Sequence, residues 1–181
     1  MTKKLSIGII GTRGIPNQYG GYEAAVQELA PRLTAKGHQV VVYCSPHQTF
    51  RENEWHSVKL NFQYNPEDKI GAAGQFIYDL KCNLHSRKQP YDVIMHMGYT
   101  SDSVWYWLWS KNSKHITNMD GMEWRRSKYT PKVQTFLKKA EKWAALHSDL
   151  LIADSEGIMQ YLQEKYPTPI QYIAYGAEIP Q

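Results

Sequence analysis

Charged and aromatic residues gather in one short segment about two thirds of the way along the chain. The segment, residues 120–126, follows an apolar run, so Asp120 is expected at the end of a strand. Its carboxylate is suited to bind a sugar hydroxyl or to act as an acid or base. Trp124 is suited to stack on a sugar face, and Arg125 and Arg126 to hold a phosphate through paired hydrogen bonds. Glu123 adds a second carboxylate. The alternative is an Asp-Gly turn followed by a surface cluster of ion pairs.

A glycine-rich segment follows the first apolar run of the chain. Gly8, Gly11 and Gly14 have the spacing G-x-x-G-x-x-G, whereas the dinucleotide fingerprint is G-x-G-x-x-G. The second apolar run ends at Tyr43-Cys44-Ser45, without the acid that would hold a ribose hydroxyl, and no Gly-Lys-Ser/Thr follows. The segment therefore argues against NAD and ATP as ligands.

Two further glycines stand directly before a predicted helix. Gly20 and Gly21 let backbone N–H groups approach an anion closely, and the helix N-terminus adds a favourable dipole. Arg13 can add a charge-assisted hydrogen bond. One interpretation is a phosphate-binding turn, and the other is a flexible loop in which Glu23 only supplies an acid to the first helical turn.

His96 and Tyr99 close another apolar run and are expected at the same edge of the sheet. A histidine within an apolar run is more often a hydrogen-bonded structural residue than a catalyst. Trp105 and Trp109 lie four residues apart on a predicted helix, which is more typical of a core than of a ligand platform.

These candidate residues must be positioned by a regular alternation of apolar runs and helical patterns. Strands are predicted over residues 5–11, 39–45, 58–64, 92–97, 115–120, 149–153 and 170–174, and helices over residues 22–36, 72–87, 101–110, 131–147 and 155–166. The predicted fold is a Rossmann-like α/β/α sandwich with a mostly parallel sheet of about seven strands. In such a sheet, ligands bind beyond the carboxyl ends of the strands.

Composition narrows the class of protein. The 181 residues suit one domain, and a net charge of +4 is too small to imply nucleic-acid binding. Cys44 and Cys82 lack metal-ligand spacing and are expected as buried thiols in a reducing cytosol. No apolar run reaches the roughly 20 residues of a membrane helix, so we expect a cytoplasmic protein.

The charge is concentrated in one stripe. Residues 125–142 contain seven Lys and Arg residues and a single acid, Glu141. Such a stripe suits an anionic partner, either a phosphate or a membrane surface. An ordinary solvated helix face is the alternative.

Five motifs, in their order and spacing, resemble the N-terminal domain of a bacterial subset of the family-four glycosyltransferases, notably capsule and O-antigen rhamnosyltransferases. The motifs are Ile7-Gly-Ile-Ile-Gly-Thr-Arg-Gly-Ile-Pro16, Tyr19-Gly-Gly-Tyr-Glu23, Asp120-Gly-Met-Glu-Trp-Arg-Arg126, Ala153-Asp-Ser-Glu-Gly157 and Tyr175-Gly-Ala-Glu178.

The resemblance implies a GT-B fold, in which two Rossmann-like domains face each other across a cleft. Residues 1–175 would be the acceptor-side domain, and residues 176–181 would begin the linker to a C-terminal domain that binds the donor. Family members are about twice as long as this chain. We therefore expect that the chain folds but does not transfer sugar alone.

The resemblance also implies roles for individual residues. Gly20 and Gly21 would lie beside the donor phosphates, and Asp120 would be the catalytic residue at the reacting sugar. The acceptor would contact Arg13, Tyr19, His96, Tyr99, Glu123, Trp124, Arg125 and Arg126.

Enzymes of this family retain the anomeric configuration and need no metal or other cofactor. By resemblance, the donor is a nucleotide-sugar, with rhamnose as the sugar of the subset, and the acceptor is a saccharide on a lipid at the inner face of the membrane. Peripheral membrane contact would follow. Two other functions stay open: a non-catalytic module that binds a lipid-linked sugar or an anionic surface, and a nucleotide-dependent oxidoreductase, which the missing ribose acid disfavours.

Overall fold

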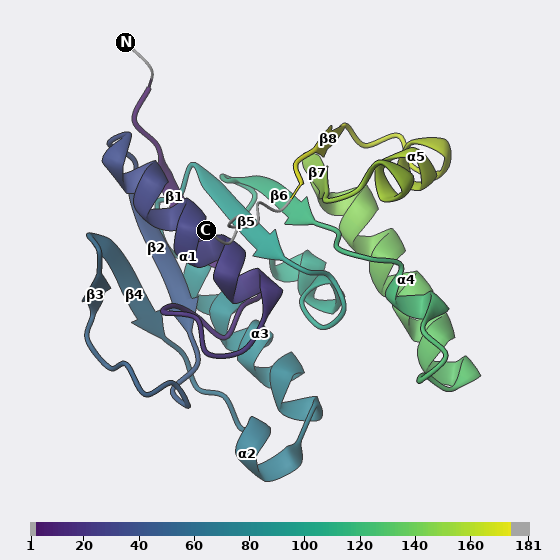
Figure 1. Cartoon of the computed structure of the whole chain (residues 1–181), viewed down its shortest axis with the longest axis horizontal. Helices are drawn as coiled ribbons and strands as arrows, with labels where there is room; N and C mark the ends of the chain where they lie inside the picture. Colours follow the sequence, from purple (N-terminus) through teal and green to yellow (C-terminus); the bar gives the residue numbers. More distant parts are fainter. Residues whose placement is uncertain (1–2, 175–181) are drawn as a thin grey trace, which may run out of the picture.

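The computed structural model describes residues 3–174, which form an eight-stranded sheet in the order β3-β4-β2-β1-β5-β6-β7-β8 (Figure 1). Every pairing is parallel except that of β3 with β4. The strands are β1 (Ser6–Ile10), β2 (Gln39–Cys44), β3 (Glu54–Trp55), β4 (Val58–Phe62), β5 (Val93–Met97), β6 (Lys114–Asn118), β7 (Leu150–Ala153) and β8 (Ile170–Tyr172).

Helices cover both faces of the sheet (Figure 1). Successive strand residues point to opposite faces, so Ile9 joins the buried cluster that contains Val26 of α1, whereas Ile10 joins the cluster that contains Tyr78 of α3. The α-helices are α1 (Gly21–Ala35), α2 (Glu67–Ile70), α3 (Ala73–Ser86), α4 (Pro131–His147) and α5 (Glu156–Lys165), and the 3₁₀-helices are η1 (Ser103–Leu108) and η2 (Glu123–Arg125).

The two last helices cover the C-terminal strands. Ala140 and Ala144 of α4, together with Leu162 of α5, are buried in one cluster with Leu151 of β7. The α5 helix begins where the hydroxyl of Ser155 accepts a hydrogen bond from the backbone of the third residue that follows. The small alanine side chains let α4 pack closely against β7 and α5. The first turns of α4 lie beside the corner that follows β6.

The direction of strand addition reverses at β1. From β1 the chain moves outward through β2 and β4, and it then returns to add β5, β6, β7 and β8 on the other side. In an open parallel sheet such a reversal leaves a crevice beyond the carboxyl ends of the two central strands. The loops that follow β1 and β5 therefore border the place where a ligand is expected.

The predicted fold class is confirmed, and each predicted strand and helix has its counterpart. The sheet has one strand more than predicted, because the two residues of β3 form a hairpin with β4 that is too short to show a pattern. The four residues of α2 were also not predicted, and the segment expected as a helix over residues 101–110 is 3₁₀. Cys44 and Cys82 are buried free thiols, as predicted.

Two sequence expectations fall outside the part of the chain that the structure describes. They are the linker over residues 176–181 and the motif that begins at Tyr175. Within residues 3–174, no helix combines the length and the apolar character needed to cross a bilayer.

Candidate functional site

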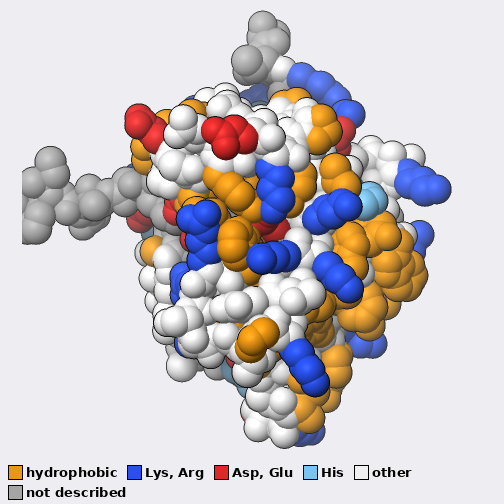
Figure 2. Space-filling model, turned by 90° about the vertical axis from the view of Figure 1, so that its right-hand side faces the viewer, with side chains coloured by type: hydrophobic (Ala, Val, Ile, Leu, Met, Phe, Trp, Pro, Cys, Tyr) orange, Lys and Arg blue, Asp and Glu red, His pale blue; other side chains and the backbone are white. Residues whose placement is uncertain are grey.

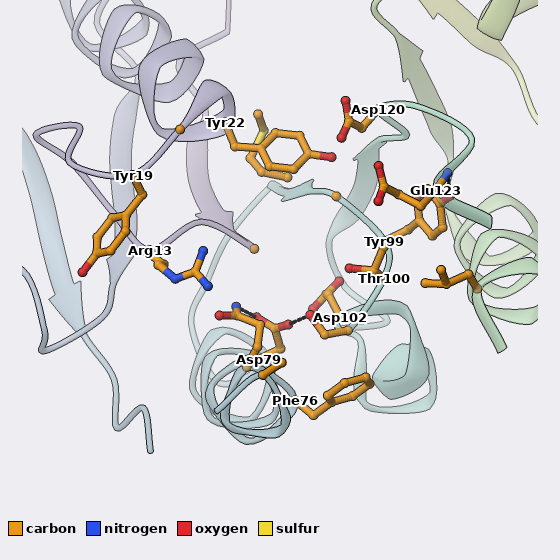
Figure 3. Close-up of a pocket in the computed structure, with 18 of the residues that line it drawn as sticks. Arg13, Tyr19, Tyr22, Phe76, Asp79, Tyr99, Thr100, Asp102, Asp120 and Glu123 are labelled. Atoms are coloured by element: carbon orange, nitrogen blue, oxygen red, sulfur yellow. Dashed lines mark hydrogen bonds between the residues drawn. The ribbon is translucent and has the colours of Figure 1, made fainter. Parts of the chain in front are cut away.

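A cavity of about 780 Å³ lies at the crevice between the carboxyl ends of β1 and β5 (Figure 3). Its walls come from the loop before α1, from the first turns of α3 and α4, and from the corners that follow β5 and β6. The lining includes eight residues that the sequence singled out: Arg13, Tyr19, Gly20, Gly21, Tyr99, Asp120, Glu123 and Arg126.

The N-terminus of α1 borders one side of the cavity. Gly20 caps the helix and Gly21 begins it, and an added Cβ would meet no atom within 4 Å at Gly21 and only Glu23 Oε2, at 3.7 Å, at Gly20. The side chain of Asn17 holds the turn, since its Oδ1 accepts hydrogen bonds from the backbone of Tyr19 (3.0 Å) and Gly20 (3.2 Å). The open approach and the helix dipole make this side suited to an anion.

Arg13 lies at the same side, but its charge is already paired. Its Nε and Nη2 atoms donate to the two carboxylate oxygens of Glu67, at 3.0 Å and 2.5 Å. This pairing raises the pKa of Arg13 and lowers the pKa of Glu67. The backbone N–H of Arg13 donates to the buried carboxylate of Glu23 (2.8 Å), so Glu23 fixes the loop and is more than a first-turn acid. An anion that binds Arg13 must compete with Glu67.

Asp120 lies across the cavity from the α1 side (Figure 3). It follows the end of β6 by two residues and has a φ of +47°, a left-handed conformation that non-glycine residues seldom adopt. Its N–H donates to Asn118 Oδ1 at 3.3 Å. The Tyr99 hydroxyl holds the corner, because it donates to the carbonyl of Gly121 (3.3 Å) and accepts from the backbone N–H of Glu123 (3.2 Å). Strain of this kind is concentrated at functional sites.

Glu123 and Arg126 form an ion pair on the same wall. The carboxylate of Glu123 lies 2.7 Å from Arg126 Nη2, and Glu123 is largely buried while half of the Arg126 side chain is exposed. Burial raises the pKa of Glu123, an effect that Arg126 partly offsets. The pair gives this wall one hydrogen-bond acceptor and one cation with accessible donors.

Three of the predicted acceptor residues do not line the cavity. The indole of Trp124 turns toward α4 and α5, where its Nε1 donates to the buried Glu141 at 2.8 Å, and Lys138 and Arg125 lie over its ring. Arg125 itself is exposed outside the cavity. The stacking of Trp124 on a sugar, expected from the sequence, does not fit this geometry, because buried Glu141 attracts the only donor of the indole ring.

His96 is completely buried and lies below the cavity, not at its rim. His115 donates from Nε2 to the Ser110 carbonyl (2.8 Å), so its Nδ1 accepts from His96 Nε2 (2.8 Å). Burial lowers the pKa of His115 to about 4, which keeps it neutral. The other ring nitrogen of His96, Nδ1, is hydrogen-bonded to Asp102 Oδ2 at 2.5 Å. His96, expected from the sequence to contact the acceptor, is instead closed off from the cavity and hydrogen-bonded to Asp102.

The structure adds acidic residues at the floor of the cavity that the sequence did not reveal. Asp79 of α3 and Asp102 after β5 are both buried and both line it. Burial, together with the charge of Asp102, raises the pKa of Asp79 to about 8, so Asp79 is mostly a neutral carboxylic acid at pH 7. Asp102 falls at the start of the helix predicted over residues 101–110, and Asp79 falls inside the helix predicted over residues 72–87, so neither was expected at a strand end.

Replacing Asp79 by Asn is expected to flatten the dependence of stability on pH. An unfolded carboxyl ionises near pH 3.9, so between about pH 4 and pH 8 the folded wild type holds the extra proton. Its free energy of unfolding must fall as the pH rises through that window, by at most about 1.4 kcal/mol per pH unit. Urea unfolding at pH 5, 6.5 and 8 measures this. Parallel profiles for Asp79→Asn and wild type would show that Asp79 is ionised throughout.

No group of three or more His, Cys, Asp and Glu side chains is arranged to hold a metal ion within residues 3–174. The side chains and backbone that line the described cavity offer several kinds of polar group. The cavity combines an open helix N-terminus on one side, a strained carboxylate on the other, and hydroxyl and carboxyl groups on the floor.

Comparison with known proteins identifies the sequence family and the fold. The family model described as "Domain of unknown function (DUF1972)" matches residues 4–178. No curated protein matches the chain. Among solved structures, a sucrose-phosphate synthase from Thermosynechococcus elongatus is similar with a TM-score of 0.58 and 13% identity, over 96% of this chain and 90% of that one.

Two structures of UGT2 from Phytolacca americana are also similar. The complex with UDP-2-fluoro-glucose and pterostilbene has a TM-score of 0.61 and 9% identity, over 97% of this chain and 55% of that one. The apo form has a TM-score of 0.56 and 10% identity, over 98% and 52%. The chain thus spans about half the length of UGT2. At these identities the likeness establishes a shared fold alone, a Rossmann-like α/β domain of the kind that forms one half of a GT-B fold.

Proposed function

The chain belongs to the DUF1972 family, and from the geometry of its cavity we propose that it is the acceptor-side domain of a retaining glycosyltransferase. The observation that carries the proposal is the pairing of an anion-binding helix end with a strained carboxylate across one cavity at the switch point of the sheet. The enzyme would move a sugar from a nucleotide-sugar to a saccharide acceptor. The likeness of the fold to a sucrose-phosphate synthase and to UGT2, whose complex holds UDP-2-fluoro-glucose, supports this proposal.

The cavity suggests a division of labour. Gly20 and Gly21 would lie beside the diphosphate, because an anion there meets backbone N–H groups and the positive end of a 15-residue helix. Asp120 would act at the reacting sugar, where a fixed carboxylate stabilises the positive charge of an oxocarbenium-like transition state. Arg13, Tyr19, Tyr99, Glu123 and Arg126 would contact the acceptor, and His96, Trp124 and Arg125 would act only through their neighbours.

The donor phosphates need partners beyond this cavity, because Arg13 is held by Glu67. We propose that a second, C-terminal domain of the natural protein supplies them, and that residues 176–181 lead to it. The catalytic step would then rely on positioning and electrostatics, without a metal. The isolated chain would fold and bind but would not transfer sugar.

The finer substrate assignments also belong to this proposal. The sequence resemblance supports rhamnose as the donor sugar, a lipid-linked saccharide as the acceptor, and a role in capsule or O-antigen synthesis at the cytoplasmic face of the inner membrane.

The side of the molecule formed by α4 and α5 carries Lys and Arg side chains around hydrophobic ones (Figure 2). Lys132, Lys138, Lys139 and Lys142 are exposed there, which suits peripheral contact with anionic lipids; sedimentation with anionic vesicles tests this contact.

The test is a transfer assay with the natural-length protein that carries this chain. dTDP-rhamnose and a set of UDP-sugars, each with a labelled sugar, are incubated with a membrane lipid extract. We expect label in the lipid fraction from one donor, in a linkage whose anomeric configuration matches that of the donor. Inversion of configuration would refute the retaining mechanism, and binding of lipid-linked sugar without transfer from any donor would favour a non-catalytic module.

A further inference from the structure

The floor of the cavity on the side of α3 contains a hydrogen-bond acceptor without a partner. Gln75 lines the cavity, and its Nε2 donates to Asp79 Oδ1 at 3.1 Å. Its Oε1 is buried and accepts no hydrogen bond from any described residue. A buried carbonyl oxygen without a donor is costly. A ligand O–H or N–H group that this oxygen meets when the Gln75 side chain turns toward the cavity would remove that cost.

A hydroxyl group lies on the other side of the same carboxyl. Ser101, in the corner after β5, lines the cavity and is half-buried, and its Oγ is 2.6 Å from Asp79 Oδ2. When Asp79 is ionised, Ser101 donates to it. When Asp79 is neutral, the carboxylic O–H can donate to Ser101 Oγ, which releases the serine proton toward the cavity. One carboxyl thus orients both polar side chains.

The charged groups around this floor already have partners. Asp102 is hydrogen-bonded to the buried His96. Arg13 faces the floor from the first loop and is paired with Glu67 (Figure 3). With Asp79 protonated, the charged groups left at the floor, Asp102 and Arg13, are each bound to another residue. An anion would meet two carboxyl groups, and a cation would meet Arg13.

We propose that Gln75 and Ser101, both held by Asp79, form a subsite for an uncharged, hydroxyl-bearing group such as a sugar ring. Gln75 Oε1 accepts from one ligand hydroxyl, and Ser101 Oγ hydrogen-bonds another. The inference rests on the proposed function in so far as it assigns this ring to the acceptor. Under this proposal, the cavity has an anion-binding side at α1 and a neutral, sugar-binding side at α3.

The subsite is tested on this chain by NMR titration with methyl α-L-rhamnoside and methyl α-D-glucoside. We expect at least one glycoside to shift the side-chain amide signals of Gln75, with saturation in the millimolar range. Gln75→Met and Ser101→Ala should each weaken that binding by about three- to tenfold, the range for loss of a single neutral hydrogen bond. Gln160→Met, an exposed glutamine on α5, serves as the matched control and should bind like wild type.

Inorganic phosphate and methylamine serve as charged probes in the same titration. Phosphate should shift the backbone signals of Gly20 and Gly21 equally in wild type and variants, which also shows that the variants are folded. The proposal is overturned if neither glycoside shifts Gln75, if both variants bind like wild type, or if methylamine alone shifts Gln75. Since no sugar is transferred in this titration, failure of the subsite is distinct from failure of the transfer assay.

Discussion

Replacement of Asp120 by Asn should lower sugar transfer by the natural-length protein by at least about a hundredfold, because removal of one preorganised electrostatic group from a transition state costs that much. Asn has the same shape and also tolerates the left-handed conformation that Asp120 adopts at φ +47°. The fold and the position of the side chain should therefore survive, while the negative charge is lost. The measurement is the initial rate of label transfer to lipid.

Asp154→Asn is the matched control for this substitution. Asp154 follows β7 and does not line the cavity. Burial, and next the charge of nearby Asp120, raise the pKa of Asp154, so the two carboxyl groups interact. We expect Asp154→Asn to transfer sugar at a rate within about threefold of wild type, because the substitution changes only the electrostatic field around the site. If Asp120→Asn transfers as fast as the control, with circular dichroism showing both folded, the catalytic group lies elsewhere.

The second large effect is on stability, and it concerns Gly11. This glycine follows β1 with a φ of +86°, and a Cβ there would lie 2.7 Å from the carbonyl oxygen and 2.9 Å from the nitrogen of Met97. Those atoms are backbone of the central strand β5 and cannot move aside as a flexible side chain would. Gly11→Ala should therefore reduce the free energy of unfolding by about 3 kcal/mol or more, through strain and overlap together.

Gly157→Ala is the control for Gly11→Ala. Gly157 lies inside α5, and an added Cβ there meets no atom within 4 Å. Alanine is the better helix former by about 0.5–1 kcal/mol, so this variant should be more stable than wild type. Urea titrations of all three proteins measure the difference. A Gly11→Ala variant within 1 kcal/mol of wild type would mean that the loop after β1 is not tightly packed on β5.

Close packing, as at Gly11, also explains the glycine spacing of the first loop, which could be mistaken for a nucleotide-binding motif. The G-x-x-G-x-x-G spacing places Gly8 against the ring of Tyr91, Gly11 against β5 and Gly14 against Cys44. All three are sites of close packing. The turn proposed to bind an anion comes later, at Gly20-Gly21, where an added Cβ would meet no atom closer than 3.7 Å.

The strands and helices could be predicted because each carries its own signal. The α4 helix begins at Pro131 and ends at His147, as its proline and apolar period indicate. The use of its apolar face was not predictable: Leu137 is buried and Val133 is 39% exposed, although both line the cavity. A hydrophobic stripe looks the same whether a neighbouring helix or a ligand covers it.

The candidate site was only partly predictable, for a related reason. Asp120 and Glu123 stand at a strand end, and the topology carries them into the cavity. Trp124 follows them in sequence but turns the other way, because buried Glu141 on α4, distant in sequence, accepts its N–H. Asp79 faces the cavity only because α3 presents that side to the crevice, a matter of packing that its helical pattern leaves open.

The most direct test of the account compares this chain with the natural-length protein in one assay of label transfer from a nucleotide-sugar to membrane lipid. The account predicts transfer by the natural-length protein and none by the chain alone, which should still give the glycoside shifts at Gln75. Transfer by the chain alone would contradict the proposal that a second domain holds the donor. No transfer by the natural-length protein from any donor, with the cavity still binding its probes, would contradict the proposed enzyme.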